Sequence, residues 1–261
     1  MDGFVLNGFG LGLFLLAAFL GGLTTGVAGF AMGLVVSGVW LHIITPMQTA
    51  FLIVACSLLP QALSIWKLRD ALSWRRLTPF IVGGVIGVPL GTMLLTYVDP
   101  AYMRFWIGVL LVIFSIYNLA KPDLGKVPGG IPADVGVGFF NGMLGGLTGL
   151  GGIIVTVWCQ MRGWPKDVQR TVFQPIILVS GVLTVVSFTA AGAATPETLK
   201  LWLIGTPVML AGVWFGLKLY GKLDEAAFRK VVLWLLLFSG GSLVVPSMMS
   251  IGQLAHALAS R

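Results

Sequence analysis

The stretch VGVGFFNGMLGGLTGLGGIIVTVWCQM, residues 135–161, carries no charged side chain and is interrupted by glycines. One membrane crossing needs about 20 predominantly apolar residues, because the hydrocarbon core of a bilayer is about 30 Å thick. As one continuous helix the stretch would be roughly 40 Å long, which is too short for two complete crossings. The segment GGLTGLGG, residues 145–152, therefore predicts two half-helices that meet at a break.

The composition of the whole chain places this stretch in a membrane protein. Of the 261 residues, 57% are hydrophobic and 10% are charged, and the mean hydropathy is +0.98. A soluble domain usually carries about 25% charged residues. So little polar surface excludes a soluble enzyme, a nucleic-acid-binding domain and a disordered chain. The two cysteines lie in apolar sequence without metal-ligand spacing, so neither disulfides nor a metal site is expected.

Further apolar runs predict the remaining crossings. The chain from 3 to 66 has no charged residue and divides at the glycine-rich segment GGLTTGVAG, residues 21–29, and at 44–48. At the second division, Pro46 has the position of a first helical residue capped by Thr45. Full spans are predicted at 47–66, 77–98, 105–120, 171–194, 201–217 and 231–250.

The two halves of the chain resemble each other in a collinear way. The matches are Thr25 with Thr148, Gly26 with Gly149, Gly29 with Gly152, Gln48 with Gln169, Gly87 with Gly212, and Gly91 with Gly216. Their shared order predicts a duplication with a first repeat at 1–121, a linker at 122–134 and a second repeat at 135–250. Each repeat would hold one glycine-broken segment and three transmembrane helices, in one all-α polytopic membrane domain.

The charges indicate that the repeats have inverted topology. With loops 67–76, 121–134, 162–170 and 218–230 in the cytoplasm, all of the 16 lysines and arginines lie there except Arg104, Lys200 and Arg261. A parallel arrangement would divide the charge more evenly, against the positive-inside rule. Each broken segment then enters and leaves on one side, either as a re-entrant hairpin or as two short helices. The longer first copy has room for a more complete N-terminal helix.

The glycine breaks indicate where a small molecule would bind. Irregular backbone at membrane depth is tolerated only where it is buried in protein or lines a water-filled cavity. Equivalent breaks in two repeats point to a transport site, and free N–H groups at half-helix starts suit an anion. Alternatively, these glycines only allow close packing of helices.

A family resemblance adds to this interpretation. The string GFFNGMLGGLTGLGGIIVTVWCQMRGWPKDVQRTVFQP, residues 138–175, resembles the second repeat of the TauE/SafE family of sulfite exporters, and GGLTTGVAGFAMGLVV, residues 21–36, resembles its first repeat. The resemblance implies transport of sulfite or organosulfonates such as sulfoacetate across a bacterial plasma (inner) membrane. Many members have a fuller glycine triplet where this chain has Val27, Ala28 and Gly29.

The candidate substrate-binding residues come from the two breaks and the spans beside them. Arg170 offers forked donors for sulfonate or carboxylate oxygens, and Gln174 follows one helical turn later. Alternatively, Arg170 is an interfacial anchor without substrate contact. Asn141 and Gln160 are weaker candidates. The predicted site comprises Thr24, Thr25, Gly26, Gly29, Gln48, Thr148, Gly149, Gly151, Gly152, Arg170 and Gln174.

The predicted function is export of a small anion by alternating access. Every Asp and Glu lies in a predicted loop or at a span end, so efflux assisted by the membrane potential, or uniport, is favoured over proton coupling. Uptake, a carboxylate substrate and a non-transporting membrane subunit stay open as alternatives. No HExxH or GxSxG motif indicates an enzyme, and no catalytic residue, cofactor or metal is expected. The expected partners are the anion and lipid, without nucleic acid, and small-residue faces are compatible with a homodimer.

Overall fold

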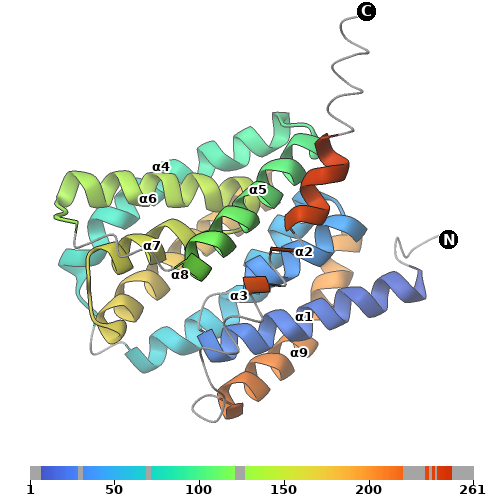
Figure 1. The fold of residues 1–261 in the computed structure, drawn as a ribbon, viewed down its shortest axis with the longest axis horizontal. Coiled ribbons are helices and arrows are strands. Elements are labelled where there is room, and N and C mark those ends of the chain that lie inside the picture. Colours follow the sequence, from blue (N-terminus) through green and yellow to red (C-terminus); the bar gives the residue numbers. More distant parts are fainter. Residues whose placement is uncertain are drawn as a thin grey trace, which may run out of the picture. The chain divides into compact units, whose positions relative to one another are not determined.

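The computed structural model describes residues 7–28, 32–68, 72–120, 127–219, 233–234, 237–238 and 240–248. Within these ranges the chain forms helices and no strand, and residues 240–248 are helical as well. The labelled helices are α1 (Gly8–Ala28), α2 (Met32–Ile43), α3 (Pro46–Leu68), α4 (Trp74–Tyr97), α5 (Pro100–Ala120), α6 (Ile131–Thr148), α7 (Ile153–Met161), α8 (Lys166–Ala190) and α9 (Pro196–Leu219) (Figure 1).

Six of these helices are long and apolar enough to cross a membrane. The candidate spans are Gly8–Val27, Pro46–Leu63, Trp74–Tyr97, Pro100–Tyr117, Val168–Ala190 and Pro196–Leu219. The predicted spans 47–66, 77–98, 105–120, 171–194 and 201–217 are thereby confirmed as helices, and α1 is long enough to be a sixth. Seven of the 20 residues of the predicted span 231–250 lie outside the described residues, as do residues 121–126 of the predicted cytoplasmic loop 121–134 and residues 220–230 of the predicted loop 218–230. The chain is an integral membrane protein by helix length and composition.

The chain divides into two compact units, each assembled from both halves of the sequence. Unit 1 contains residues 1–49, 97–122 and 205–261, and unit 2 contains residues 50–96 and 123–204. The predicted boundary at 122–134 therefore does not separate the compact units, and α6 begins inside that predicted linker, at Ile131. The two predicted repeats stay a hypothesis about duplication of the sequence.

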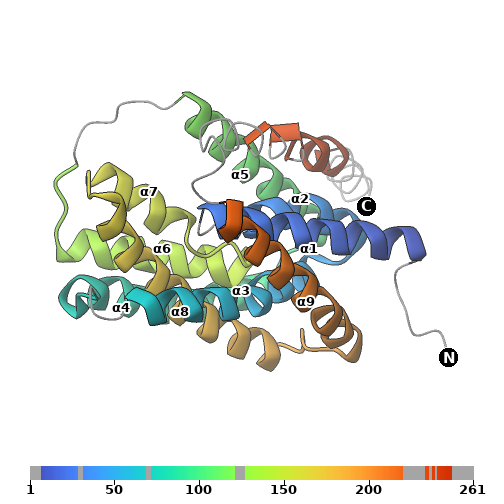
Figure 2. The same ribbon diagram turned by 90° about the horizontal axis from the view of Figure 1, so that it is seen from below.

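In unit 2, helices α4 and α6 pack through glycines with their backbones in direct approach, and they lie side by side in Figures 1 and 2. A Cβ atom added to Gly142 would lie 2.8 Å from the Cα and carbonyl oxygen of Gly84. An added Cβ atom would also collide with the backbone of the other helix at further glycines of the contact, which are Gly83, Gly87 and Gly91 of α4 and Gly138 and Gly146 of α6. Small residues at four-residue spacing permit this contact in a membrane, where van der Waals packing drives helix association.

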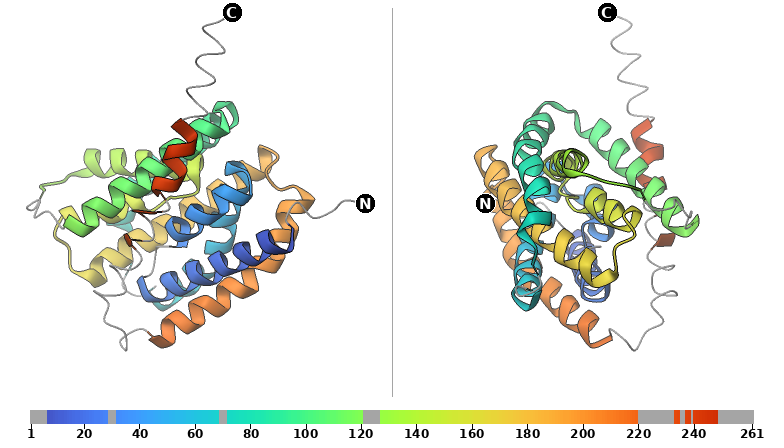
Figure 3. Two further views of the ribbon diagram at one scale, coloured as in Figure 1. Left: turned by 45° about the vertical axis from the view of Figure 1, so that its right-hand side comes forward. Right: turned by 90° about the vertical axis from the view of Figure 1, so that its left-hand side faces the viewer.

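In unit 1, α1 packs in the same way against residues 205–219 of α9 (Figure 3, left). A Cβ atom added to Gly26 would lie 2.5 Å from the carbonyl oxygen of Val213 and 2.8 Å from the Cα of Gly216. Gly22 approaches Met209 and Val213 similarly. These glycines are therefore required for helix contact.

The two contacts share one register. Gly212 faces the backbone of α1 as Gly87 faces that of α6, and the equivalent pairs are Phe19 with Phe139, Leu23 with Met143, Gly22 with Gly142 and Gly26 with Gly146. The predicted match of Gly26 with Gly149 is therefore wrong by one helical turn. Continued to the helix ends, the register matches Ala28 with Thr148, which are the last residues of α1 and α6.

Candidate functional site

The chain breaks between α6 and α7, within the glycine-rich segment from which the fold was predicted. Gly149 adopts a left-handed backbone with φ 74° and donates its N–H to the carbonyl of Gly145 at 2.8 Å, which ends α6. Gly152, with φ 113°, precedes the first residue of α7. A Cβ atom on Gly145 would lie 3.1 Å from the Cα of Gly151, so the loop folds back over the last turns of α6. We call residues 149–152 the α6–α7 break.

Asn141 holds the start of α7. Its side-chain oxygen Oδ1 accepts the N–H of Gly152 at 2.9 Å and the N–H of Val155 at 3.3 Å. The first amides of a helix have no partner within the helix, so a side-chain acceptor from α6 replaces one here. Asn141 is completely buried. Among the described residues, the amides of Ile153 and Ile154 have no acceptor. These two amides are therefore the part of the α7 N-terminus that is available to an anion.

Three buried polar atoms near the break have no hydrogen-bond partner among the described residues. They are Nδ2 of Asn141, Oγ1 of Thr156 and Oε1 of Gln174, and each residue is at most 4% exposed. They belong to α6, α7 and α8, which pack pairwise against one another. Leaving a buried polar group unpaired costs about 1–3 kcal/mol, so three such groups on neighbouring helices make this region a candidate site for a polar ligand.

The α8 face that carries the predicted substrate residues faces the break. Arg170, Gln174 and Ile177 have the spacing of residues that share one helix face. A Cβ atom on Gly152 would lie 2.6 Å from Cδ1 of Ile177, so this face contacts the break. Gln174 is buried and Arg170 is half-buried. Of the predicted residues of the second repeat, Gly149, Gly151 and Gly152 lie in the break, and Gln174 and Arg170 lie about one and two turns before Ile177 on α8.

Thr148 and Gly149 shape the break through contacts with the protein itself. The hydroxyl of Thr148 donates to the carbonyl of Leu144 at 2.7 Å and accepts the N–H of Leu150 at 3.1 Å. A Cβ atom on Gly149 would lie 2.6 Å from the carbonyl oxygen of Ala50 in α3. Both residues were predicted to bind substrate, and in the structure they hold the end of α6 in place.

The predicted break at 21–29 is wrong in position, because α1 continues through it to Ala28. The hydroxyls of Thr24 and Thr25 both donate to the carbonyl of Gly21, at 2.8 and 2.9 Å. Gly26 packs against α9, so close contact explains the glycines of this segment. Gly29 lies outside the described residues.

Gln48 caps a helix in the structure. Its Oε1 accepts the backbone N–H of Thr45 at 3.2 Å and the Thr45 hydroxyl at 3.1 Å, while the Gln48 N–H donates to that hydroxyl at 3.2 Å. This reciprocal pair is a capping box at the start of α3. The predicted substrate contact of Gln48 has no support here, and the sequence T-x-x-Q was the signal that pointed to a cap. Unit 1 contains Thr24, Thr25, Gly26 and Gln48, whereas unit 2 contains the α6–α7 break.

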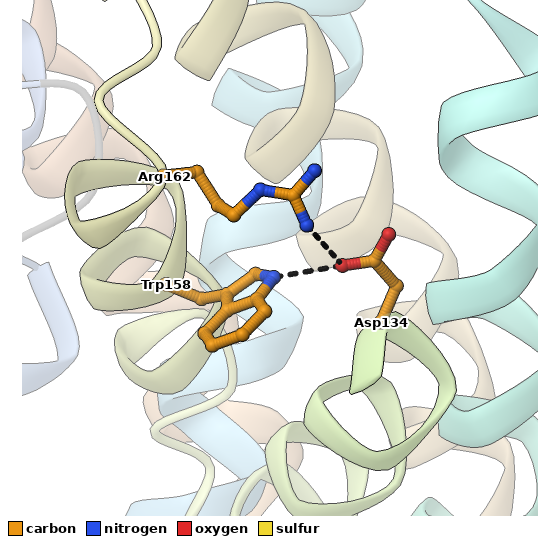
Figure 4. Close-up of polar contacts among 3 residues, drawn as sticks. All are labelled: Asp134, Trp158 and Arg162. Carbon is orange, nitrogen blue, oxygen red and sulfur yellow. Dashed lines mark hydrogen bonds and ion pairs between the residues drawn. The ribbon is translucent and has the colours of Figure 1, made fainter. Parts of the chain in front are cut away.

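The opposite end of the α6–α7 pair is closed by a charged cluster, shown in Figure 4. Oδ1 of Asp134 accepts the indole N–H of Trp158 at 2.8 Å and lies 3.5 Å from Nη1 of Arg162. The Arg162 guanidinium also lies 5.1 Å from the ring centre of Trp164. In unit 1, the indole of Trp40 donates to the carbonyl of Phe14 at 3.1 Å within an aromatic stack. Equivalent ends are thus held by a charged cluster in one unit and by a hydrogen-bonded aromatic stack in the other.

Comparison with known proteins identifies one family. The family model described as sulfite exporter TauE/SafE matches residues 14–243. No curated protein and no solved structure matches the chain. The matched region includes all helices from α2 to α9, and therefore the whole α6–α7 break.

Proposed function

Because the chain belongs to the sulfite exporter TauE/SafE family, a family of membrane transporters, we propose that it carries small sulfur-containing anions such as sulfite or sulfoacetate. The bound anion would lie at the α6–α7 break.

The observation that carries the proposal is the presence of two unpaired donors beside the break, the amino group of Asn141 and the hydroxyl of Thr156. Asn141 and Thr156 provide donors, and the amides of Ile153 and Ile154 are available at the positive end of the α7 dipole. An anion with several oxygens would accept from these groups and relieve their desolvation. Arg170, on the same α8 face as Gln174, would add attraction at longer range.

Transport would proceed by a change of access between two inverted repeats. The shared register of α1 on α9 and of α4 on α6 supports a duplicated unit. The concentration of basic residues in alternate loops supports inversion and a cytoplasmic location for 67–76, 121–134, 162–170 and 218–230. One repeat's broken segment and the neighbouring span would move against the rest of the protein around a central site.

The proposed direction is export from the cell. Efflux of a monoanion from a cell with a negative interior gains about 2.3 kcal/mol for each 100 mV of membrane potential. No coupling ion is needed for that gain. Every acidic residue of the chain lies in a predicted loop or at a span end, which supports uncoupled flux.

The function is tested by flux in proteoliposomes at a clamped potential, without a proton or sodium gradient. We expect sulfite flux that increases with the potential and that is inhibited by sulfoacetate more than by acetate. Flux that ignores the potential and requires a cation gradient would contradict uncoupled export. Equal transport of short carboxylates would contradict sulfur specificity, and no flux of any anion would favour a non-transporting subunit.

Thr156→Val is expected to raise stability and weaken anion binding together. The substitution removes a buried hydroxyl that has no partner within the described part of the chain, so the free energy of unfolding should increase by about 1 kcal/mol. If that hydroxyl donates to the anion, sulfite affinity should fall about five- to tenfold. Thermal unfolding in detergent, with and without sulfite, measures both changes.

Thr184→Val is the matched control for Thr156→Val. The Thr184 hydroxyl is equally buried but donates to the carbonyl of Ser180 at 2.8 Å. Its loss should lower stability slightly and leave sulfite affinity unchanged. If both substitutions change affinity alike, Thr156 has no role in binding.

A further inference from the structure

We infer that Asn141 binds the anion directly: its amide holds α7 with one end and donates to an oxygen of the substrate with the other. This inference rests on the proposed function and adds a residue to it. The sequence ranked Asn141 only among the weaker candidates.

The orientation of the Asn141 amide follows from its bonds. The N–H groups of Gly152 and Val155 both point at the same side-chain atom, at 2.9 and 3.3 Å. Only the oxygen of an asparagine amide can accept, so this atom is Oδ1. The amino group, Nδ2, is therefore directed away from these two amides, with two N–H donors.

The two N–H donors of Nδ2 are unused in the part of the chain that the structure describes. Asn141 is 0% exposed, and Nδ2 has no partner among the described residues. A buried amino group in this state favours a ligand that presents lone pairs and no competing proton. Sulfite and sulfonate oxygens meet that requirement, whereas an ammonium group would oppose it. The two accepted N–H bonds also polarise the amide, which strengthens Nδ2 as a donor.

The coupling of the two roles explains why an asparagine is needed. Aspartate could still accept both N–H groups of α7, and the positive end of the helix would favour its charge. It would replace the two donors with a negatively charged oxygen directed at the anion. Leucine would remove the acceptor and the donors together. The two substitutions thus separate holding α7 from binding the anion.

The test compares Asn141→Asp and Asn141→Leu with a control at another helix start. Asn7 is exposed, and its Oδ1 accepts the N–H of Gly10 at 2.8 Å, so Asn7→Asp makes the same chemical change at the start of α1. Asn141→Asp should weaken sulfite binding at least about tenfold while its unfolding temperature stays above that of Asn141→Leu. Asn7→Asp should change neither quantity. Unchanged affinity in Asn141→Asp, or affinity that falls only in proportion to stability, would overturn the inference.

A measurement on the wild-type protein keeps the inference testable if Asn141→Asp does not fold. The asparagines of the chain are Asn7, Asn118 and Asn141. With ¹⁵N-labelled asparagine, sulfite should shift the side-chain amide resonances of Asn141 and leave those of Asn7 unchanged. No shift at saturating sulfite would overturn the role of Asn141 while transport by the protein still stood. If the wild-type protein binds none of sulfite, sulfate and sulfoacetate, the proposed function fails and this inference fails with it.

Discussion

Gly142→Leu is expected to prevent the stable packing of unit 2. A Cβ atom at this position would lie 2.8 Å from two backbone atoms of Gly84 and 3.1 Å from the amide nitrogen of Val88, so α4 would have to move away. Backbone atoms cannot change rotamer to make room. Overpacking of this kind costs about 1–3 kcal/mol for a few methylenes and more where the backbone must shift. We expect a loss of at least about 3 kcal/mol, seen as a fall in unfolding temperature of roughly 10 °C.

Gly136→Leu is the matched control, because it places the same side chain on the same helix. Gly136 has no atom within 4 Å of an added Cβ. Leucine also favours helix more than glycine does, so this variant should be as stable as the wild type or more stable. Thermal unfolding in detergent, followed by a fluorescent thiol probe or by circular dichroism, compares the two. Equal unfolding temperatures for the two variants would show that α4 and α6 are not in close backbone contact.

The transmembrane helices were predictable from hydropathy, and their ends were not. The predicted span 201–217 is part of a longer helix, from Pro196 to Leu219. The prediction began too late because Glu197 and Lys200, near the start of this helix, lie outside the apolar window. Charged residues stop an apolar window but do not stop a helix, since a helix can extend into the interface or water. The same reason places the start of α6 at Ile131, before the charged residue Asp134.

The two glycine-rich segments had to be told apart by packing. In segment 21–29, Gly22 and Gly26 are four residues apart, which is the spacing of a helix face, and they pack against α9. In segment 145–152, Gly149, Gly151 and Gly152 are too close together for one face, and two of them have positive φ. Composition alone gave both segments the same interpretation. The spacing of the glycines was the signal in the sequence that distinguishes a packing face from a break. A packing face also requires a partner helix, which for Gly22 and Gly26 is α9.

The candidate site was only partly predictable for a related reason. The shared face of Arg170 and Gln174 follows from helix geometry, and in the structure Ile177, which has the spacing of the same face, lies against Gly152 of the break. The role of Asn141 depends on the fold of the break, because the two N–H groups that its side chain accepts lie 11 and 14 residues further along the chain. An isolated asparagine in an apolar helix indicates that its side chain has a buried hydrogen-bond partner, but it does not identify that partner.

Gly149→Ala is expected to displace the α6–α7 break and to abolish most sulfite transport. At φ 74°, an alanine costs roughly 1–2 kcal/mol relative to glycine. Its Cβ would also lie 2.6 Å from the carbonyl oxygen of Ala50 and 2.9 Å from the Ala50 Cα. The loop would have to move away from α3, and the N–H groups of Gly152 and Val155 would move with it relative to Asn141. We expect sulfite flux to fall at least about tenfold, because a shift of about 1 Å in a binding site can cost that much or more.

Gly192→Ala separates the two causes of this loss. Gly192 has φ 82°, close to that of Gly149, and an added Cβ there meets no atom within 4 Å. This variant therefore bears the backbone cost alone and should lower stability by roughly 1 kcal/mol with little change in flux. The difference between the two variants measures the close approach of Gly149 to Ala50. If both variants transport sulfite at the same rate, the position of the break against α3 does not matter for transport, and the site must be sought elsewhere in the chain.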